Sequence, residues 1–244
     1  MKNTLLLITA FALTFSSCKK DKSIETNLEV NFSQTVNGES LEQNALQYTN
    51  ADGQDYSVKK LWYIISDITL HSDEGENVIK DYHFIDIDNP STLSFTINDL
   101  EDANYTSISY TMGLDSIKNI SNVYVNEDFH TTMFWPEEME NGMFMGGGYH
   151  YMKLEGNYTN DTLAFNTHTG GTMGMDYSFN HTDVISLIID ALTINTALTI
   201  NMEVNNWYQN PNSITLSTDG IMGNKMIQMQ IKQNGADVFS TTIN

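Results

Sequence analysis

The sequence predicts an all-β protein, an antiparallel β-sandwich or Greek-key arrangement with long loops and little helix. Three observations support this prediction. Apolar and polar residues alternate in short segments along most of the chain. These segments are rich in β-branched and aromatic residues, and turn-forming residues separate them at short intervals. Stretches with helical periodicity are few, so two packed sheets are the expected way to bury the apolar faces.

The expected strands follow in order along the chain. They cover residues 28–32, 61–70, 82–87, 93–97, 105–112 and 193–204. Turn signals lie at residues 36–38, 51–53, 73–75, 88–90, 210–212 and 218–220. The apolar stretch 183–191 fits a short helix and a buried strand equally well, because periodicity does not separate the two in so short a run.

The N-terminus has the form of a lipoprotein signal peptide. Lys2 precedes an apolar run over residues 4–15, which is too short to cross a bilayer as a mature helix. Small residues then lead to Cys18, the only cysteine of the chain, so no internal disulfide can form. We expect cleavage after residue 17, lipidation of Cys18 and an outer-membrane lipoprotein that faces the periplasm or the cell surface. The alternative is an unprocessed signal with a free thiol.

The mature chain is expected to be a polar tether over residues 18–27 and one domain over residues 28–244. Removing 17 of 244 residues leaves 227, with only three prolines and no internal linker. The net charge is −20, and all 11 cationic side chains are lysines. Without arginine forks or a basic face, phosphate or nucleic-acid recognition is excluded as an expected function. The acidic surface is interpreted first as a solubility feature and second as a site for a cationic partner.

Residues 128–176 combine histidines and methionines in an unusual density. They hold three of the six histidines, His130, His150 and His168, and seven of the thirteen methionines. Imidazole and thioether are the ligands that soft Cu(I) prefers, whereas magnesium and calcium take oxygen ligands. The pattern therefore motivates a copper site. The alternative is structural, because methionine fills irregular gaps in cores and a single histidine in a strand is often an ordinary polar residue.

Several motifs resemble a known family when they are taken in order. They are YTNADGQDYSVKKLWYIISDI at 48–68, FIDID at 84–88 followed by Ser91, YTMGLD at 110–115, MFW at 133–135, GYHYMKLEG at 148–156, HTGG at 168–171 and MEVNNWY at 202–208. In this order and spacing the chain resembles the MbnP-like copper-binding domain family, named for the periplasmic protein associated with methanobactin and similar to the MopE and CorA copper proteins of methane-oxidising bacteria. The motifs span nearly the whole mature chain.

The resemblance implies an exported β-sandwich that binds copper. In some members the ligands are histidines and a tryptophan that a di-haem partner enzyme of the cytochrome peroxidase type oxidises to kynurenine. Trp135 matches that tryptophan, and His168 lies in the His-x-Gly-Gly motif. His130 and His150 are added as candidate ligands from composition and from their proximity in the sequence.

The chain departs from the family pattern directly after Trp135. The family has a short, tryptophan-containing segment here, whereas this chain inserts residues 136–147. Two interpretations stay open. In the first, Met143 or Met145 replaces the oxidised tryptophan as a ligand. In the second, the insert is a loop without metal and Trp135 is a core aromatic residue.

Binding rather than catalysis is the expected activity. The sequence has no Gly-x-Ser-x-Gly elbow, no His-Glu-x-x-His pattern and no phosphate-binding glycine loop before a helix. We therefore expect an exported copper-binding lipoprotein that takes up or handles Cu(I). The alternative is a surface lipoprotein that binds glycans or a protein without metal, with Trp62, Trp207 and tyrosines as exposed stacking platforms.

Overall fold

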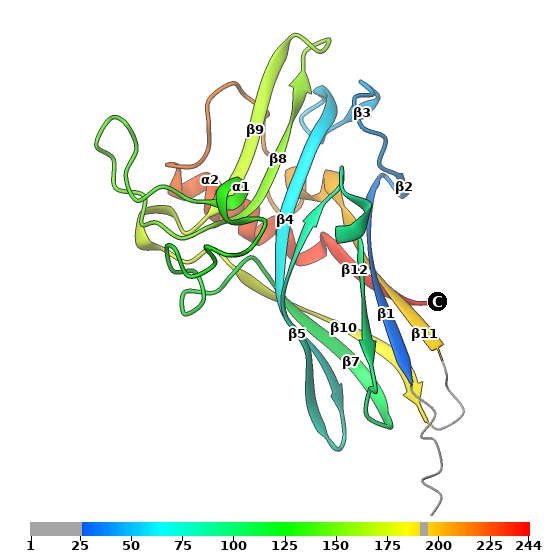
Figure 1. Ribbon diagram of the computed structural model, residues 1–244. Coiled ribbons are helices and arrows are strands. Elements are labelled where there is room, and N and C mark those ends of the chain that lie inside the picture. Colours follow the sequence, from blue (N-terminus) through cyan, green and yellow to red (C-terminus); the bar gives the residue numbers. More distant parts are fainter. Residues whose placement is uncertain (1–25, 191–194) are drawn as a thin grey trace, which may run out of the picture.

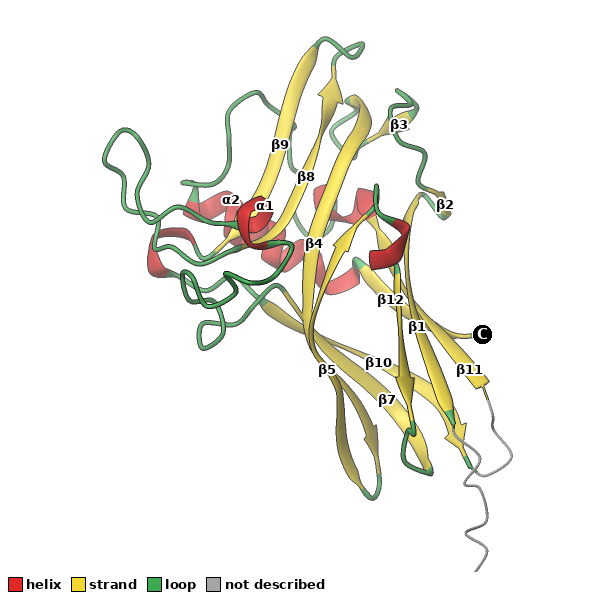
Figure 2. Cartoon of the chain, in the orientation of Figure 1, coloured by secondary structure: helices red, strands yellow, loops and turns green. Residues whose placement is uncertain are grey.

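Two packed β-sheets form the molecule, as the computed structural model shows for residues 26–190 and 195–244 (Figure 1, Figure 2). The predicted fold class, an all-β sandwich with long loops and little helix, is confirmed. The predicted signal peptide, Cys18 and most of the tether lie outside the described residues. Within the described ranges, no helix has the length and apolar character needed to cross a membrane.

The smaller sheet contains the first and last strands of the chain. Its strands are β1 (Asn27–Val36), β2 (Glu39–Ser40), β6 (Ser94–Asn98), β11 (Asn195–Glu203) and β12 (Phe239–Ile243). The order is β12-β11-β1-β2, and β6 also pairs with β1. The β1–β11 pair is parallel, whereas the other pairs are antiparallel. A parallel pair needs a long connection rather than a hairpin, and about 160 residues separate these two strands.

The larger sheet carries the candidate site. Its strands are β3 (Tyr48–Thr49), β4 (Asp55–Ser72), β5 (Gly75–Asp86), β7 (Ala103–Met112), β8 (His150–Tyr158), β9 (Leu163–Gly170) and β10 (Phe179–Ile189). The order is β10-β7-β4-β8-β9, with β3 and β5 also paired to β4. The 18-residue strand β4 therefore connects the β7–β10 half of the sheet to the β8–β9 half.

The helical elements are short. They are η1 (Pro90–Thr92), α1 (His130–Met133), η2 (Thr172–Gly174), η3 (Val204–Tyr208), α2 (Lys225–Asn234) and η4 (Gly235–Asp237). The ten-residue α2 was not expected from the sequence. The Asn224 side chain accepts hydrogen bonds from the Met226 and Ile227 amides and so caps its N-terminus. Figure 1 shows α1 and α2 beside the β8–β9 pair.

The predicted strands recur at the expected places, with shifts of a few residues at their ends. The ambiguous stretch 183–191 is strand as far as residue 189, because it pairs with β7 along its length. Residue 191 and the first two residues of the strand expected at 193–204 lie outside the described residues. The main core lies between the two sheets, and a smaller cluster lies on the opposite face of β4 around Ile64, Met133 and Tyr149.

Candidate metal site

The candidate site lies on the face of β8 and β9 that points away from the main core. Met152 and Leu154 belong to the core. Side chains alternate along a strand, so Lys153 and Glu155 point to the other face, where His168 is the register partner of Lys153. The long connection 113–149, which includes α1, covers this face. The Lys153 ammonium donates a hydrogen bond to the Thr132 carbonyl at 3.2 Å, which links the 113–149 connection to β8.

A β-bulge brings His150 next to His168. The pairing of β8 with β9 shifts between residues 150 and 152, so that one extra residue, Tyr151, sits in β8. Such a bulge re-aims the side chains beside it. The His150 and His168 rings consequently lie with centroids 5.1 Å apart and planes at 87°. The imidazole rings of two adjacent strands are therefore direct neighbours.

His150 is buried and has a free ring nitrogen. Its Nδ1 lies 3.1 Å from the Met133 carbonyl oxygen, which can only accept, so Nδ1 carries the proton. Its Nε2 is buried without any hydrogen-bond partner, one of two such side-chain atoms in the described part of the chain. Burial, and then the neighbouring His168, lowers the pKa of His150 to about 3. The ring is neutral at physiological pH, and its Nε2 lone pair is available to a ligand.

A carboxylate orients the second histidine. His168 Nε2 lies 2.8 Å from Glu155 Oε1, and both side chains are largely buried. The hydrogen bond from His168 holds the pKa of Glu155 below its usual range, so the carboxylate is charged and accepts. Nε2 of His168 therefore carries a proton, and in the neutral ring Nδ1 holds the lone pair. Histidines that bind metals usually donate their other nitrogen to a carboxylate in this way.

Trp135 completes the cluster. It is fully buried, and its ring centroid lies 4.7 Å from that of His150. The indole nitrogen donates to the Met145 carbonyl at 3.3 Å. A Cβ at Gly170 would lie 2.5 Å from Trp135 Cε3, so the ring packs directly on the backbone at the end of β9. The family-matched tryptophan, His150 and His168 therefore occupy one cluster, although they are 33 residues apart in the sequence.

A glycine run leads the chain from the insert into His150. Gly146, Gly147 and Gly148 have φ values of +104°, +74° and +93°, which side chains with a Cβ rarely adopt. A Cβ at Gly146 would also lie 2.8 Å from the Gly174 amide nitrogen. The Asn119 side chain accepts from the Tyr149 amide at 2.7 Å and fixes the exit from the run. The run therefore brings the backbone of the insert close to that of η2.

The other predicted ligands have contacts of their own. His130 Nδ1 lies 2.9 Å from the Tyr149 hydroxyl, and its ring packs against Phe134. The Met145 side chain is buried, and its backbone oxygen is the acceptor for Trp135. Met143 is 38% exposed and places its sulfur over Gly223. Across residues 26–190 and 195–244, no group of three or more His, Cys, Asp and Glu side chains could hold a metal ion. Copper ligation by these residues stays a prediction.

Two residues that support the cluster were missed from the sequence. Glu155 belongs to a Lys-Leu-Glu-Gly stretch that looks like an ordinary strand and turn, and only its pairing next to β9 puts it beside His168. Gln228 on α2 is buried, donates to the His168 carbonyl at 2.8 Å and accepts from the Gly170 amide at 3.4 Å. The sequence around Gln228, Met-Ile-Gln-Met at 226–229, gives no signal for this role.

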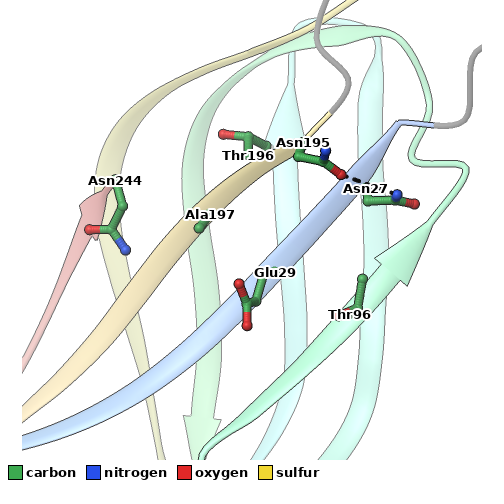
Figure 3. A pocket seen from close by; sticks show the side chains of 7 residues that line it. All are labelled: Asn27, Glu29, Thr96, Asn195, Thr196, Ala197 and Asn244. Atoms are coloured by element: carbon green, nitrogen blue, oxygen red, sulfur yellow. Dashed lines mark hydrogen bonds between the residues drawn. The ribbon is translucent and has the colours of Figure 1, made fainter.

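A separate hollow of about 500 Å³ lies on the smaller sheet, at the ends of β1 and β11 (Figure 3). Small polar side chains line it, and Asn27 donates to Asn195 at 3.3 Å across it. Glu29 is its one ionisable residue. The hollow holds no histidine or methionine, and it contributes nothing to the candidate metal site.

Fold and site together define a class: a β-sandwich with a buried tryptophan, a buried histidine and a second, largely buried histidine on the outer face of one sheet. The MbnP family model matches residues 25–229, and the chain therefore belongs to the MbnP family. The solved structure of MbnP from Methylosinus trichosporium has a similar fold, with a TM-score of 0.55 and 10% identity. The similarity covers 90% of this chain and 99% of that one. No curated protein matches the chain.

Proposed function

We propose that this protein binds Cu(I) at His150 and His168. One observation carries the proposal: a buried, neutral imidazole whose Nε2 has no hydrogen-bond partner, with a second imidazole 5.1 Å away between ring centroids. A buried polar atom without a partner costs free energy, about 1–3 kcal/mol, which a ligand would recover. The neutral His150 imidazole and the neighbouring His168 imidazole suit copper, because imidazole is a common copper ligand.

Both the candidate ligand nitrogens and the groups that orient them fit a copper ion. His150 Nε2 and His168 Nδ1 hold the free lone pairs, while the Met133 carbonyl and the Glu155 carboxylate fix the two tautomers. Copper is cargo here rather than a catalyst, and we propose binding without catalysis. The role would be acquisition or handling of copper by an exported protein that lipid on Cys18 anchors to the outer membrane.

Trp135 adds a partner to the proposal. Its position against His150 supports the family's use of this tryptophan, in which a di-haem enzyme of the cytochrome peroxidase type oxidises the ring. Because the indole is fully buried, such a partner would have to act at a distance or after a local opening of the protein. Mass spectrometry of protein produced with and without that enzyme would show whether Trp135 is modified.

The alternative of a glycan- or protein-binding surface without metal is weaker. Trp207, one of its two expected stacking platforms, is 1% exposed and packs against Phe179 and Phe239, so that expectation is wrong. The ammonium groups of Lys60 and Lys153 lie over the Trp62 ring, at 5.0 and 4.9 Å from its centre. An aromatic face already covered by two cations is a poor platform for a sugar.

The test is a Cu(I) titration of the domain after Cys18 against a chromophoric chelator. We expect one ion per chain in the buried pair, with affinity reduced at least a hundredfold in His150→Ala and in His168→Ala. His130→Ala is the matched control, because His130 lies outside the pair, and it should bind as the unchanged protein does. Equal affinity in all four proteins would reject the proposal.

A further inference from the structure

The chain concentrates methionines on one side of the β8–β9 pair. Eight of the thirteen come from three segments: Met139, Met143, Met145, Met173, Met175, Met222, Met226 and Met229. The segments are the insert after Trp135, the short η2 region, and the loop before α2 together with the first half of α2. Figure 1 shows the insert and α2 on the same side of β8 and β9.

Direct contacts join the three segments. The Met173 amide donates to the Met145 carbonyl at 2.8 Å, which ties η2 to the insert. The Thr172 hydroxyl donates to the Met222 carbonyl at 2.7 Å, which ties η2 to the loop before α2. Met143 joins the insert to the loop before α2, because its sulfur lies 2.8 Å from the position that a Cβ on Gly223 would occupy.

Most of these methionines face solvent. Met143 is 38% exposed and Met175 is 48% exposed, while Met173 and Met222 are half-buried. Methionine in a core fills gaps, but an exposed thioether fills none. Leucine or a polar residue would serve equally well at such positions if packing were the only requirement. The repeated choice of thioether at the surface therefore needs a chemical reason.

The methionine segments also adjoin the histidine pair. The Met145 carbonyl accepts the indole hydrogen bond of Trp135, and Gln228 on α2 donates to the His168 carbonyl. His150 and Trp135 are buried. An ion from solvent would therefore first contact the neighbouring surface, which the methionine segments form.

We propose a second, solvent-accessible site for Cu(I), built from the thioethers of Met143, Met173, Met175 and Met222. Uncharged sulfur ligands select soft monovalent ions and offer little to calcium or magnesium. The net charge of −20 raises the local concentration of cations. The site would capture Cu(I) at the surface and pass it to the buried pair, and this delivery role rests on the proposed function above.

Silver(I) and Cu(I) titrations of the domain, with carbon-13-labelled methionine methyl groups, test the proposal. We expect two ions per chain, with shifts of the four named methyl signals on the second equivalent of Ag(I), after the histidine pair is filled. In the fourfold variant Met143→Leu, Met173→Leu, Met175→Leu and Met222→Leu, one ion should remain, and loading of the buried pair should slow at least tenfold. Leucine conserves the volume, and a thermal melt checks that the variant folds.

Two further proteins separate the possible outcomes. Met226→Leu with Met229→Leu removes two exposed thioethers outside the named set and should still bind two ions. His150→Ala with His168→Ala should keep the methyl shifts and bind one ion. If that double variant binds two ions, the buried site fails while the surface site stands. If the fourfold variant keeps two ions and fast loading, the surface is an apolar docking face and our inference is wrong.

Discussion

Removing the carboxylate beside His168 should weaken Cu(I) binding without removing a ligand. Glu155 Oε1 accepts a hydrogen bond from His168 Nε2 at 2.8 Å. The Glu155 side chain is 27% exposed and the His168 side chain is 14% exposed. The carboxylate charge makes the other nitrogen of His168 a stronger electron-pair donor to a metal ion, and the hydrogen bond fixes the ring orientation. Loss of such an outer partner typically costs 10–100-fold in affinity, about 1.4–2.7 kcal/mol. We expect about tenfold for Glu155→Gln, which retains an acceptor, and about a hundredfold for Glu155→Leu.

The assay is competition for Cu(I) at one equivalent, at a pH where Glu155 is ionised. Glu29→Gln is the control, because it removes the same charge from an exposed position on β1, on the other sheet. Its affinity should stay within twofold of the unchanged protein. The reasoning is refuted if Glu155→Leu also stays within twofold while His168→Ala loses binding, since His168 would then need no orienting group.

Three further changes have definite expected results. Gly170→Ala drives a Cβ to 2.5 Å from Trp135 and should destabilise the domain by about 1–3 kcal/mol in urea unfolding, whereas Gly220→Ala, with no atom within 4 Å, should be nearly neutral; equal effects would contradict the packing. Unfolded histidine binds a proton near pH 6.5 and folded His150 only near about 3, so the unfolded state gains protons as pH falls. The metal-free domain should lose about 2 kcal/mol through His150 between pH 7 and pH 5, and an unchanged slope in His150→Gln would disprove this origin. Cys18→Ser in the full chain should move the protein from the membrane to the soluble fraction, and membrane retention would rule out the lipid anchor.

The sequence predicted the sandwich because alternation and turn residues are local signals. Strands β1, β4, β7 and β11 appear where these signals place them. The parallel β1–β11 pairing could not be predicted from the sequence, because it depends on which strands far apart in the chain pair with each other. Helix α2 was also missed, because seven of its ten residues are methionine, glutamine or lysine and form no clear apolar stripe. Its buried residues are Gln228, Ile231 and Asn234.

Candidate residues were recognised by type, but their geometry was not predictable. Composition brought His130, His150 and His168 forward together. The His-x-Gly-Gly motif singled out His168, but nothing in the sequence separated His130 from His150. The separation comes from the bulge at Tyr151, which turns His150 toward His168, and from the Tyr149 hydroxyl, which holds His130 elsewhere. Register shifts of one residue leave no sequence signal but decide which side chains meet.

X-ray absorption at the copper edge, on the domain loaded with one equivalent of Cu(I), tests the central claim most directly. The account predicts a low-coordinate Cu(I) with two imidazole nitrogens, visible by the multiple scattering of their rings, and loss of that pattern in His150→Ala. A first shell of sulfur alone, or an imidazole pattern that persists in the variant, would contradict a copper site at His150 and His168.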